Sequence, residues 1–435
     1  MGYQQGLSGL QGASSDLDVI GNNIANANTV GFKEGEAEFA DMYANSVATA
    51  VNNQIGIGSQ MSEVQQQFGQ GNITSTSQAL DIAINGNGFF QMDSNGASVY
   101  SRNGVFNLAA NGTIVNSAGQ ELMGYAANSS GIIDSSSTVP LTVPTSNLPP
   151  VATANAAFSF NLDSQTTPPT VTPFNPANSA TYSATNSIQV FDSLGGAHTV
   201  NVYFVPSTTT PNTWEAYATT TATTGAPALA VGNPSATPPV LPGATGNLGD
   251  LGPVTFSATG QMIAAPPATG SPAPFSISIP DAASSTAGAT QAISLSFTGT
   301  TQYGSATGLV SSSQDGYASA QLEGFTVGTD GTLYGTYSNN KTQALGQVAL
   351  ATFANQNGLQ DIGGNNYEAT LASGNANISV PGSTNHGTLQ GGAVENSNVD
   401  LTSSLVDLIT AQRNYQANAQ TIKTQQTVDQ TLINL

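Results

Sequence analysis

The chain has 435 residues, with 5 Lys or Arg against 25 Asp or Glu and a formal net charge of -20. An acidic surface repels phosphate backbones and anionic head groups, so we expect no nucleic-acid partner and no membrane insertion. The absence of Cys excludes disulfides and thiolate metal sites, and no run of about 18 apolar residues predicts a membrane helix.

The N-terminal segment has the apolar spacing of a helix. Steps of three and four residues average the 3.5 residues of a coiled-coil seam, and they join Leu7, Leu10, Ser14, Leu17, Gly21 and Ile24. The pattern then runs into the polar sequence "GNNIANANTVGFK" at residues 21–33, which ends in one of the few basic residues, Lys33. This polar stretch predicts the end of the helix.

Two blocks further along the chain have the pattern of β-hairpins. In residues 72–145 and again in 305–392, short apolar runs alternate with Asn-Gly, Asp-Gly and related turn signals. The "NGNGFF" sequence contains Gly86 and Gly88 in a Gly-x-Gly arrangement. It leads into an apolar strand and not into a helix, so it predicts a turn and not a phosphate site.

Residues 146–304 are rich in Thr, Ser, Pro and Ala and contain five acidic residues but no Lys or Arg. Stretches such as "SIQVFDSLGGAHTVNVYFV" alternate apolar and polar residues, which predicts strands. A disordered linker is the alternative interpretation, but the content of Val, Phe, Ile and Tyr exceeds that of a solvated tract. We therefore predict an inserted β domain.

The C-terminal segment repeats the helical pattern over a longer span, with Asp400 as its predicted N-cap. One track along it contains Leu401, Leu405, Leu408, Gln412, Tyr415, Ala419, Ile422 and Ile433. Polar residues interrupt both terminal seams, and helices without tertiary support are marginal in water. The spacing alone leaves two interpretations open: the core of a monomeric bundle, or packing against the helices of other copies.

The predicted fold class is therefore α+β and mainly β, with discontinuous nested domains. Two β-rich outer domains lie between the terminal helices in the sequence, and the family resemblance described below implies that these helices form a coiled-coil-like polymerisation core. The expected boundaries are 1–35 and 393–435 for the helical domain, 36–71 for a connecting segment, 72–145 and 305–392 for one β domain, and 146–304 for the insert.

Residues suited to catalysis are few. The only histidines are His198 and His386, which are far apart in sequence and are each interpreted as structural or surface residues. No Ser lies in a nucleophile-elbow motif, and no pair of carboxylates stands out among the 25 acids. The sequence predicts no enzyme, no cofactor and no metal site.

Both ends of the chain resemble one known family. "LSGLQGASSDLDVIGNNIANANTVGFK" at residues 7–33 and "NVDLTSSLVDLITAQRNYQANAQTIKTQQTVDQTLINL" at 398–435 are similar to the terminal signatures of the bacterial flagellar axial proteins, the rod and hook subunits. The resemblance continues through "LDIAINGNGFFQM" at 80–92 and "LGQVALATFAN" at 345–355. It implies an axial-family motif that marks where the chain leaves an inner helical tube, made of Asn22, Asn23, Asn26, Asn28, Gly31 and Phe32.

The resemblance also implies a function. A rod subunit would be far shorter, and a filament flagellin would lack "NNIANANTVGFK", so the hook subunits of the family fit best. One alternative is a distal rod or other axial subunit. A second alternative is a secreted β-rich adhesin or carbohydrate-active protein. A hook subunit polymerises with itself into a curved, flexible helical tube that transmits motor torque to the filament. Its implied further partners are the distal rod, the hook cap and the hook–filament junction proteins. Its implied location is the extracellular hook, reached by type III export without a cleaved signal peptide.

Overall fold

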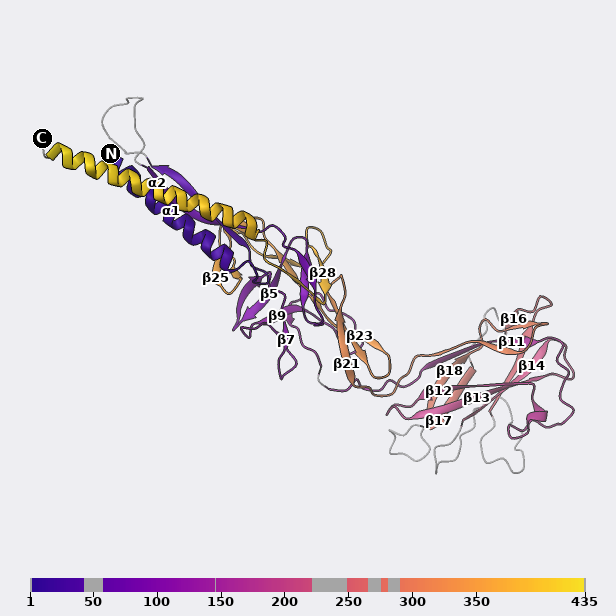
Figure 1. Cartoon of the computed structure of the whole chain (residues 1–435). Helices are drawn as coiled ribbons and strands as arrows, with labels where there is room; N and C mark the ends of the chain where they lie inside the picture. The colour runs from indigo at the N-terminus through magenta and orange to yellow at the C-terminus, as the bar shows by residue number, and fades with distance from the viewer. Residues whose placement is uncertain are drawn as a thin grey trace. The chain divides into compact units, whose positions relative to one another are not determined.

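The two predicted terminal helices are present in the computed structural model as α1 (Gly2–Ala25) and α2 (Leu401–Ile433), and they run side by side (Figure 1). The predicted N-cap of α2 is confirmed, because Asp400 Oδ1 accepts hydrogen bonds from the N–H groups of Thr402 (2.8 Å) and Ser403 (3.3 Å). These bonds satisfy donors that a helix N-terminus otherwise leaves unpaired.

The structure describes residues 2–42, 58–144, 146–220, 249–264, 275–280 and 290–433. They divide into unit 1, made of residues 1–145, 322–336 and 340–435, and unit 2, made of residues 146–321 and 337–339. Parts of the expected regions lie outside the described residues: 1, 434 and 435 of the helical domain, 43–57 of the connecting segment, 145 of the first β domain, and 221–248, 265–274 and 281–289 of the insert.

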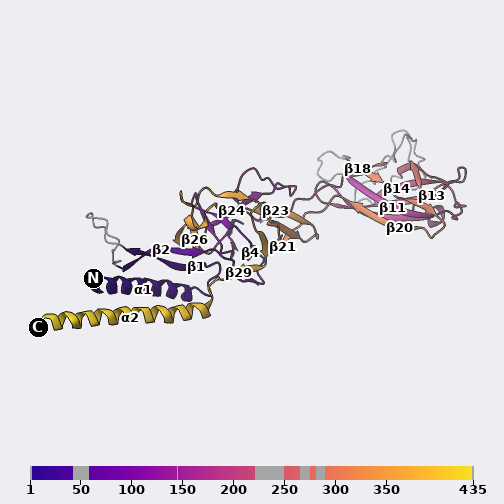
Figure 2. The ribbon, with the colours of Figure 1, turned by 90° about the horizontal axis from the view of Figure 1, so that it is seen from above.

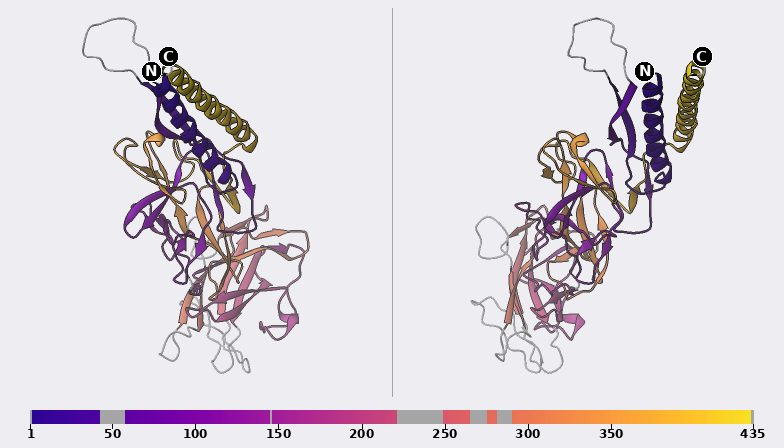
Figure 3. Two further views of the ribbon diagram at one scale, coloured as in Figure 1. Left: turned by 60° about the vertical axis from the view of Figure 1, so that its left-hand side comes forward. Right: turned by 90° about the vertical axis from the view of Figure 1, so that its left-hand side faces the viewer.

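The segment after α1 forms a hairpin of strands β1 (Glu34–Met42) and β2 (Gly58–Gln67), which pair antiparallel from Glu34↔Gln67 onward. Figures 2 and 3 show α1 lying between this hairpin and α2. Part of the segment that we expected only to connect the domains thus has regular structure. The contact is close at Gly12, where an added Cβ would lie 3.4 Å from the Phe39 ring.

The β part of unit 1 is built from strands of both flanking sequence segments, which pair with each other. Phe90 pairs with Leu350, Ile84 with Leu389, and Gly124 with Val348. The same strands bury one apolar cluster that contains residues from both segments, including Phe90, Leu122 and Leu350. The two segments are therefore one folding unit, although most of unit 2 separates them in sequence.

The largest sheet of the described residues runs in the order β21-β22-β23-β9-β5-β6-β26-β25. A short 3-10 helix spans Gln356–Gly358. The strands of this part of unit 1 are β3 (Ile73–Ser75), β4 (Ile82–Asn85), β5 (Phe89–Ser94), β6 (Ala97–Ser101), β7 (Asn107–Leu108), β8 (Ile114–Val115), β9 (Glu121–Ala126), β10 (Val139–Pro140), β21 (Leu322–Val327), β22 (Thr332–Tyr337), β23 (Thr342–Val348), β24 (Leu350–Thr352), β25 (Gln360–Gly363), β26 (Asn366–Glu368), β27 (Asn377–Ser379), β28 (Thr388–Gly391) and β29 (Ala393–Glu395).

Unit 2 consists of two sheets around a separate core. One has the order β17-β18-β11-β19, with β20 also paired to β11, and the other has the order β12-β13-β14-β15-β16. A short 3-10 helix spans Ser179–Thr181. The strands are β11 (Asn155–Asp163), β12 (Ala184–Phe191), β13 (Ala197–Pro206), β14 (Thr213–Thr220), β15 (Gly249–Phe256), β16 (Met262–Ala264), β17 (Phe275–Pro280), β18 (Thr290–Ser296), β19 (Thr301–Tyr303) and β20 (Gly308–Gln314).

Alternation of apolar and polar residues places one face of each central strand of unit 2 in this core. In β11 every second residue from Ala156 to Leu162 is buried, and β13 follows the same pattern. The strands predicted in "SIQVFDSLGGAHTVNVYFV" at residues 187–205 are confirmed as β12 and β13, which pair antiparallel. Aromatic rings fill the centre, where Phe158 stacks on Phe160 and Phe297.

We predict that Phe158→Ala lowers the free energy of unfolding of unit 2 by about 3–5 kcal/mol, because a cavity remains where a fully buried ring stood. The only Trp of the chain, Trp214, is buried in the same core, so its fluorescence reports unfolding of unit 2. The matched control is Leu350→Ala in the core of unit 1, which should leave the Trp214 transition unchanged. Equal effects of the two substitutions on Trp214 would contradict two independent cores.

Candidate functional site

Helices α1 and α2 approach each other most closely at glycines of α1. Ser404 and Ala411 are buried on α2, and Asn418 lies close to Gly9 of α1. An added Cβ at Gly9 would lie 2.8 Å from Asn418 Oδ1, and one at Gly6 would lie 3.0 Å from Ile422 Cγ1. Glycine on α1 therefore permits the close approach of the two helices.

The large apolar side chains of α2 are mostly left in solvent. Their exposed fractions are 48% for Leu401, 47% for Leu405, 58% for Val406, 50% for Ile409, 37% for Tyr415 and 50% for Val428. A contiguous exposed apolar strip marks a surface that other molecules cover. We call Leu401, Leu405, Val406, Ile409 and Tyr415 the outer strip of α2.

The predicted seam residues therefore fall into two groups. Leu401, Leu405 and Tyr415 are exposed within the subunit, whereas Leu408, Ala419 and Ile422 are partly buried. On α1, Leu7 is exposed, and Leu10, Leu17 and Ile24 are partly buried. Ile433 is the last residue of α2.

Among the buried residues of α1, sequence reasoning named Asn23 but missed Gly6, Gly12, Ala13 and Ile20. They lie beside the predicted track and not on it. One signal could have found them. Glycine is unfavourable inside a helix, so its repetition at positions 6, 9 and 12 indicates close packing against another element.

The axial-family motif forms the turn from α1 into β1. Asn23 is buried, donates from Nδ2 to the Gly35 carbonyl (2.7 Å) and accepts at Oδ1 from the Gly35 N–H (3.0 Å). Asn26 donates to Asn22 Oδ1 (2.9 Å) at the helix end, while Asn28 is exposed and Phe32 is partly buried. The asparagine side chains thus replace helix hydrogen bonds where the backbone reverses.

Gly31 is required for this turn. Its φ of +72° is in the left-handed region, and an added Cβ would lie 2.6 Å from the Asn103 backbone nitrogen. Its N–H donates to the carbonyl of Glu395, six residues before α2 begins. The motif therefore joins the end of α1 to the segment that leads into α2.

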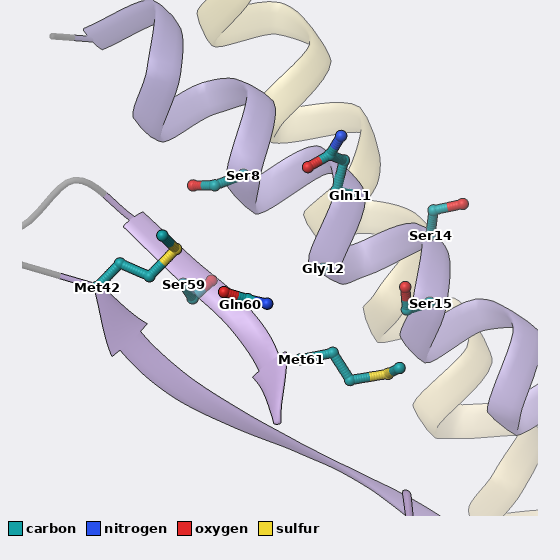
Figure 4. A pocket seen from close by; sticks show the side chains of 9 residues that line it. All are labelled: Ser8, Gln11, Gly12, Ser14, Ser15, Met42, Ser59, Gln60 and Met61. Carbon is teal, nitrogen blue, oxygen red and sulfur yellow. The ribbon is translucent and has the colours of Figure 1, made fainter. Parts of the chain in front are cut away.

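A recess of about 630 Å³ lies between α1 and the β1–β2 hairpin (Figure 4). Hydroxyl, amide and thioether groups line it, with no titratable side chain among Ser8, Gln11, Gly12, Ser14, Ser15, Met42, Ser59, Gln60 and Met61. These groups offer neither an acid nor a base for catalysis.

Carboxylates gather where α1, β1 and α2 meet. Burial raises the pKa of Asp16 on α1, and the charge of Asp407 on α2 raises it further. Burial likewise raises the pKa of Glu34, and the charges of Glu36, Asp407 and Asp400 add to the shift. Ionised carboxylates at this point therefore oppose the packing of α2.

We predict that lowering the pH from about 7 to about 5 strengthens the contact between α1 and α2. A carboxyl with a raised pKa in the folded state binds protons more readily there than in the unfolded state, so the contact gains stability as the pH falls toward that raised pKa. Circular dichroism of the full-length subunit measures the helical signal. In the control variant Asp407→Asn the increase of the helical signal at low pH should be smaller. An unchanged increase would contradict the role of the Asp407 charge in this contact.

Both histidines are buried in structural surroundings. His198 Nε2 lies 3.1 Å from Asp192 Oδ2 in unit 2, and His386 Nε2 lies 3.0 Å from the Asn377 carbonyl in unit 1. The described residues contain no group of three or more His, Asp or Glu placed to hold a metal ion. Within the same residues, no helix has the length and apolarity needed to cross a membrane.

Comparison with known families gives the class of protein to which this fold and helix surface belong. Four family models match: "Flagella basal body rod protein" at residues 4–33, "Flagellar hook protein FlgE/F/G D1 domain" at 83–165, "Flagellar basal body protein FlaE D2 domain" at 161–317 and "Flagellar basal body rod FlgEFG protein C-terminal" at 390–435. These matches define a polymerising axial subunit of the bacterial flagellum.

Full-length relatives narrow the class. The chain belongs to the flagellar hook protein family, and its role is that of a structural subunit of the hook. It is 39% identical to the flagellar hook protein FlgE of Salmonella typhimurium and 40% identical to that of Escherichia coli, in each case over 100% of both chains. The Treponema pallidum hook protein is 32% identical over 99% of this chain and 98% of that one. A crystal structure of Helicobacter pylori FlgE2 matches with a TM-score of 0.49 at 13% identity, covering 73% of this chain and 99% of that chain.

Proposed function

We propose that the subunit polymerises into a curved, flexible tube that transmits torque from the flagellar motor to the filament, and that α1 and α2 form its inner core. The observation that carries this proposal is the outer strip of α2, which leaves large apolar side chains exposed in a single subunit. Burial of that strip by identical helices of neighbouring copies removes apolar area from water at about 25 cal/mol per Å². A repeated contact of this kind, made head to tail, generates a helical filament.

The proposal assigns a role to each part of the chain. Residues 1–35 and 393–435 form the polymerisation domain, residues 36–71 connect it, residues 72–145 and 305–392 form the first β domain, and residues 146–304 form the outer insert. We further propose that the distal rod, the hook cap and the hook–filament junction proteins contact the two ends of the tube. The subunit reaches the extracellular hook through the type III export apparatus without signal cleavage, and it uses neither a catalytic site nor a cofactor.

The absence of Cys allows a direct test of the inner core. Leu405→Cys introduces the only thiol, and a fluorophore attached there reports whether the outer strip loses contact with water during assembly. Tubes seen by negative-stain microscopy, together with a blue shift of the label, support the proposal. A matched label at exposed Thr342 of unit 1 should shift less, and tubes in which the Leu405→Cys label stays in water would refute the assignment of the strip.

A further inference from the structure

Three charged side chains are buried together in unit 1, although the chain has only five basic residues. Lys33 Nζ lies 2.6 Å from Glu395 Oε1, and Arg102 Nη1 lies 3.2 Å from Glu395 Oε2. The side chains of Lys33 and Glu395 are 0% exposed and that of Arg102 is 2% exposed. We call Lys33, Arg102 and Glu395 the ionic triad.

The triad also binds the backbone of a third segment. Glu395 Oε1 accepts a hydrogen bond from the Gly71 N–H (2.8 Å), and Lys33 Nζ donates to the Gly69 carbonyl (2.8 Å). Arg102 stands over the ring of Phe89 at 5.4 Å, so the β5 strand supports its guanidinium. The carboxylate of Glu395 therefore joins the segment after α1, the segment after β2, the loop after β6 and the strand before α2.

The backbone crosses closely around the triad. An added Cβ at Gly71 would lie 2.0 Å from the Asn396 carbonyl oxygen, so the two chain segments touch there. Asn398 extends the same junction, because its Oδ1 accepts from the Glu34 N–H (2.8 Å) and its Nδ2 donates to the Gln67 carbonyl (2.7 Å). These contacts hold the end of α1 and the start of α2 against the same β strands of unit 1.

Charge balance makes Glu395 the critical member. Burial lowers the pKa of Lys33 and of Arg102, and in both cases the charge of Glu395 opposes that effect. Loss of the carboxylate would leave two buried cations without a counter-charge, which proteins tolerate poorly. Loss of Lys33 alone would leave the balanced pair of Arg102 and Glu395.

The helix pair cannot set its own register strongly. At the closest points between the helices, Gly6 and Gly9 of α1 meet Ile422 and Asn418 of α2, and glycine offers no side chain to interlock. The triad is anchored eight residues after α1 ends and six residues before α2 begins. The ion pairs and backbone contacts of the triad can therefore fix the register of α1 relative to α2 where α1 ends and α2 begins.

We propose that Glu395 is a positioning residue for assembly. Through Lys33 and Arg102 it fixes the end of α1 and the start of α2 on the β strands of unit 1. Every subunit then presents the outer strip of α2 in the same register. This inference rests on the proposed function of the helices. Glu395 touches no neighbouring copy in this scheme. It acts through the segments that lead into the helices.

The test compares full-length Glu395→Gln with Glu368→Gln, which removes an exposed carboxylate in β26 of the same unit. Hydrogen exchange of the free subunit should accelerate by about tenfold or more at residues 29–35, 69–71 and 393–399 in Glu395→Gln only. Tube formation should be lost in that variant, while the Trp214 unfolding transition stays unchanged. Normal tubes or unchanged exchange in Glu395→Gln would overturn the proposal.

Two further variants separate positioning from simple charge balance. Lys33→Met keeps the balanced Arg102–Glu395 pair, so it should fold even if Glu395→Gln does not, but it should still loosen residues 29–35 and reduce assembly. The double variant Glu395→Gln with Lys33→Met returns the buried charge to the wild-type value without restoring the bridge. The double variant leaves Arg102 as the one buried cation of the triad, so it should recover only part of the stability that Glu395→Gln loses and should not form tubes, and recovered tubes would overturn the positioning role. If the unmodified subunit itself forms no tubes, that result contradicts the proposed function. The contacts of the ionic triad are then tested by hydrogen exchange alone.

Discussion

Replacement of Leu405 by Asp is expected to abolish tube formation while leaving the free subunit folded. Leu405 is 47% exposed in the subunit, so a carboxylate there stays hydrated and leaves the unfolding transition of both units nearly unchanged. In the assembled tube the same carboxylate would be buried among apolar side chains, at a cost of several kcal/mol per subunit. Sedimentation and negative-stain microscopy should find monomers only.

Thr421→Asp is the matched control. Thr421 is an exposed residue of the same helix, sixteen positions further along, which places it about 160° around the axis from Leu405. It adds the same charge to an already acidic chain, so general repulsion between subunits is equal in the two variants. Assembly of Thr421→Asp with failure of Leu405→Asp supports the outer strip; assembly of both would show that α2 faces its neighbours with another side.

Leu405 is a sharper probe than Leu408, although both lie on the seam that the sequence predicts. Leu408 is partly buried within the subunit, so a charge there would also disturb the contact with α1. The spacing of apolar residues predicted that α2 is a helix and where it begins, because periodicity and the Asp400 cap are local properties. It could not separate the side facing α1 from the side facing other copies, because both sides belong to one broad apolar track.

The β structure was predictable where strands alternate and turns contain Asn-Gly or Gly-Gly, as in β12 and β13. It was not predictable in β1 and β2, whose burial pattern has no regular alternation because much of the hairpin is solvent-exposed. On the α1 side of this hairpin Phe39 lies against Gly12, but this residue stays 42% exposed and adds no regular apolar pattern. Polar strands of this kind are not distinguishable from a connecting segment by composition.

The ionic triad was beyond sequence reasoning for a different reason. Lys33 was conspicuous as a rare base, but its partner Glu395 is 362 positions away and is one of 25 acids. Contacts between distant segments bring Lys33 and Glu395 together, among them the pairing of β3 with β29, which places Glu395 opposite Ile73, and the hydrogen bond from the Gly31 N–H to the Glu395 carbonyl. Contacts between segments far apart in the sequence therefore form the ionic triad, and the local sequence pattern does not predict it.

Replacement of residues 149–319 by a short Gly/Ser linker is expected to leave a subunit that folds and still forms tubes. Leu148 and Ala320 are joined by two backbone hydrogen bonds (2.8 and 3.2 Å), so the ends that the linker must connect already lie side by side. The buried clusters of unit 1 contain only residues of unit 1, and that of unit 2 contains only residues 156–297. Removal of the second core therefore leaves the first intact.

The exact junction matters for this deletion. A linker that replaced only residues 151–303 would keep β20 but remove its partner β11, and an unpaired strand edge promotes aggregation. With the junction at Leu148 and Ala320, electron microscopy should show tubes with a thinner wall, because the deletion removes the domain that we propose lies on the outside of the tube. Addition of Leu405→Asp to the same deletion should abolish these tubes, which would show that they use the outer strip of α2. Monomeric or aggregated protein from the deletion alone would mean that unit 2 is needed for folding or for axial assembly. The proposal that unit 1 folds and assembles without unit 2 would then be wrong.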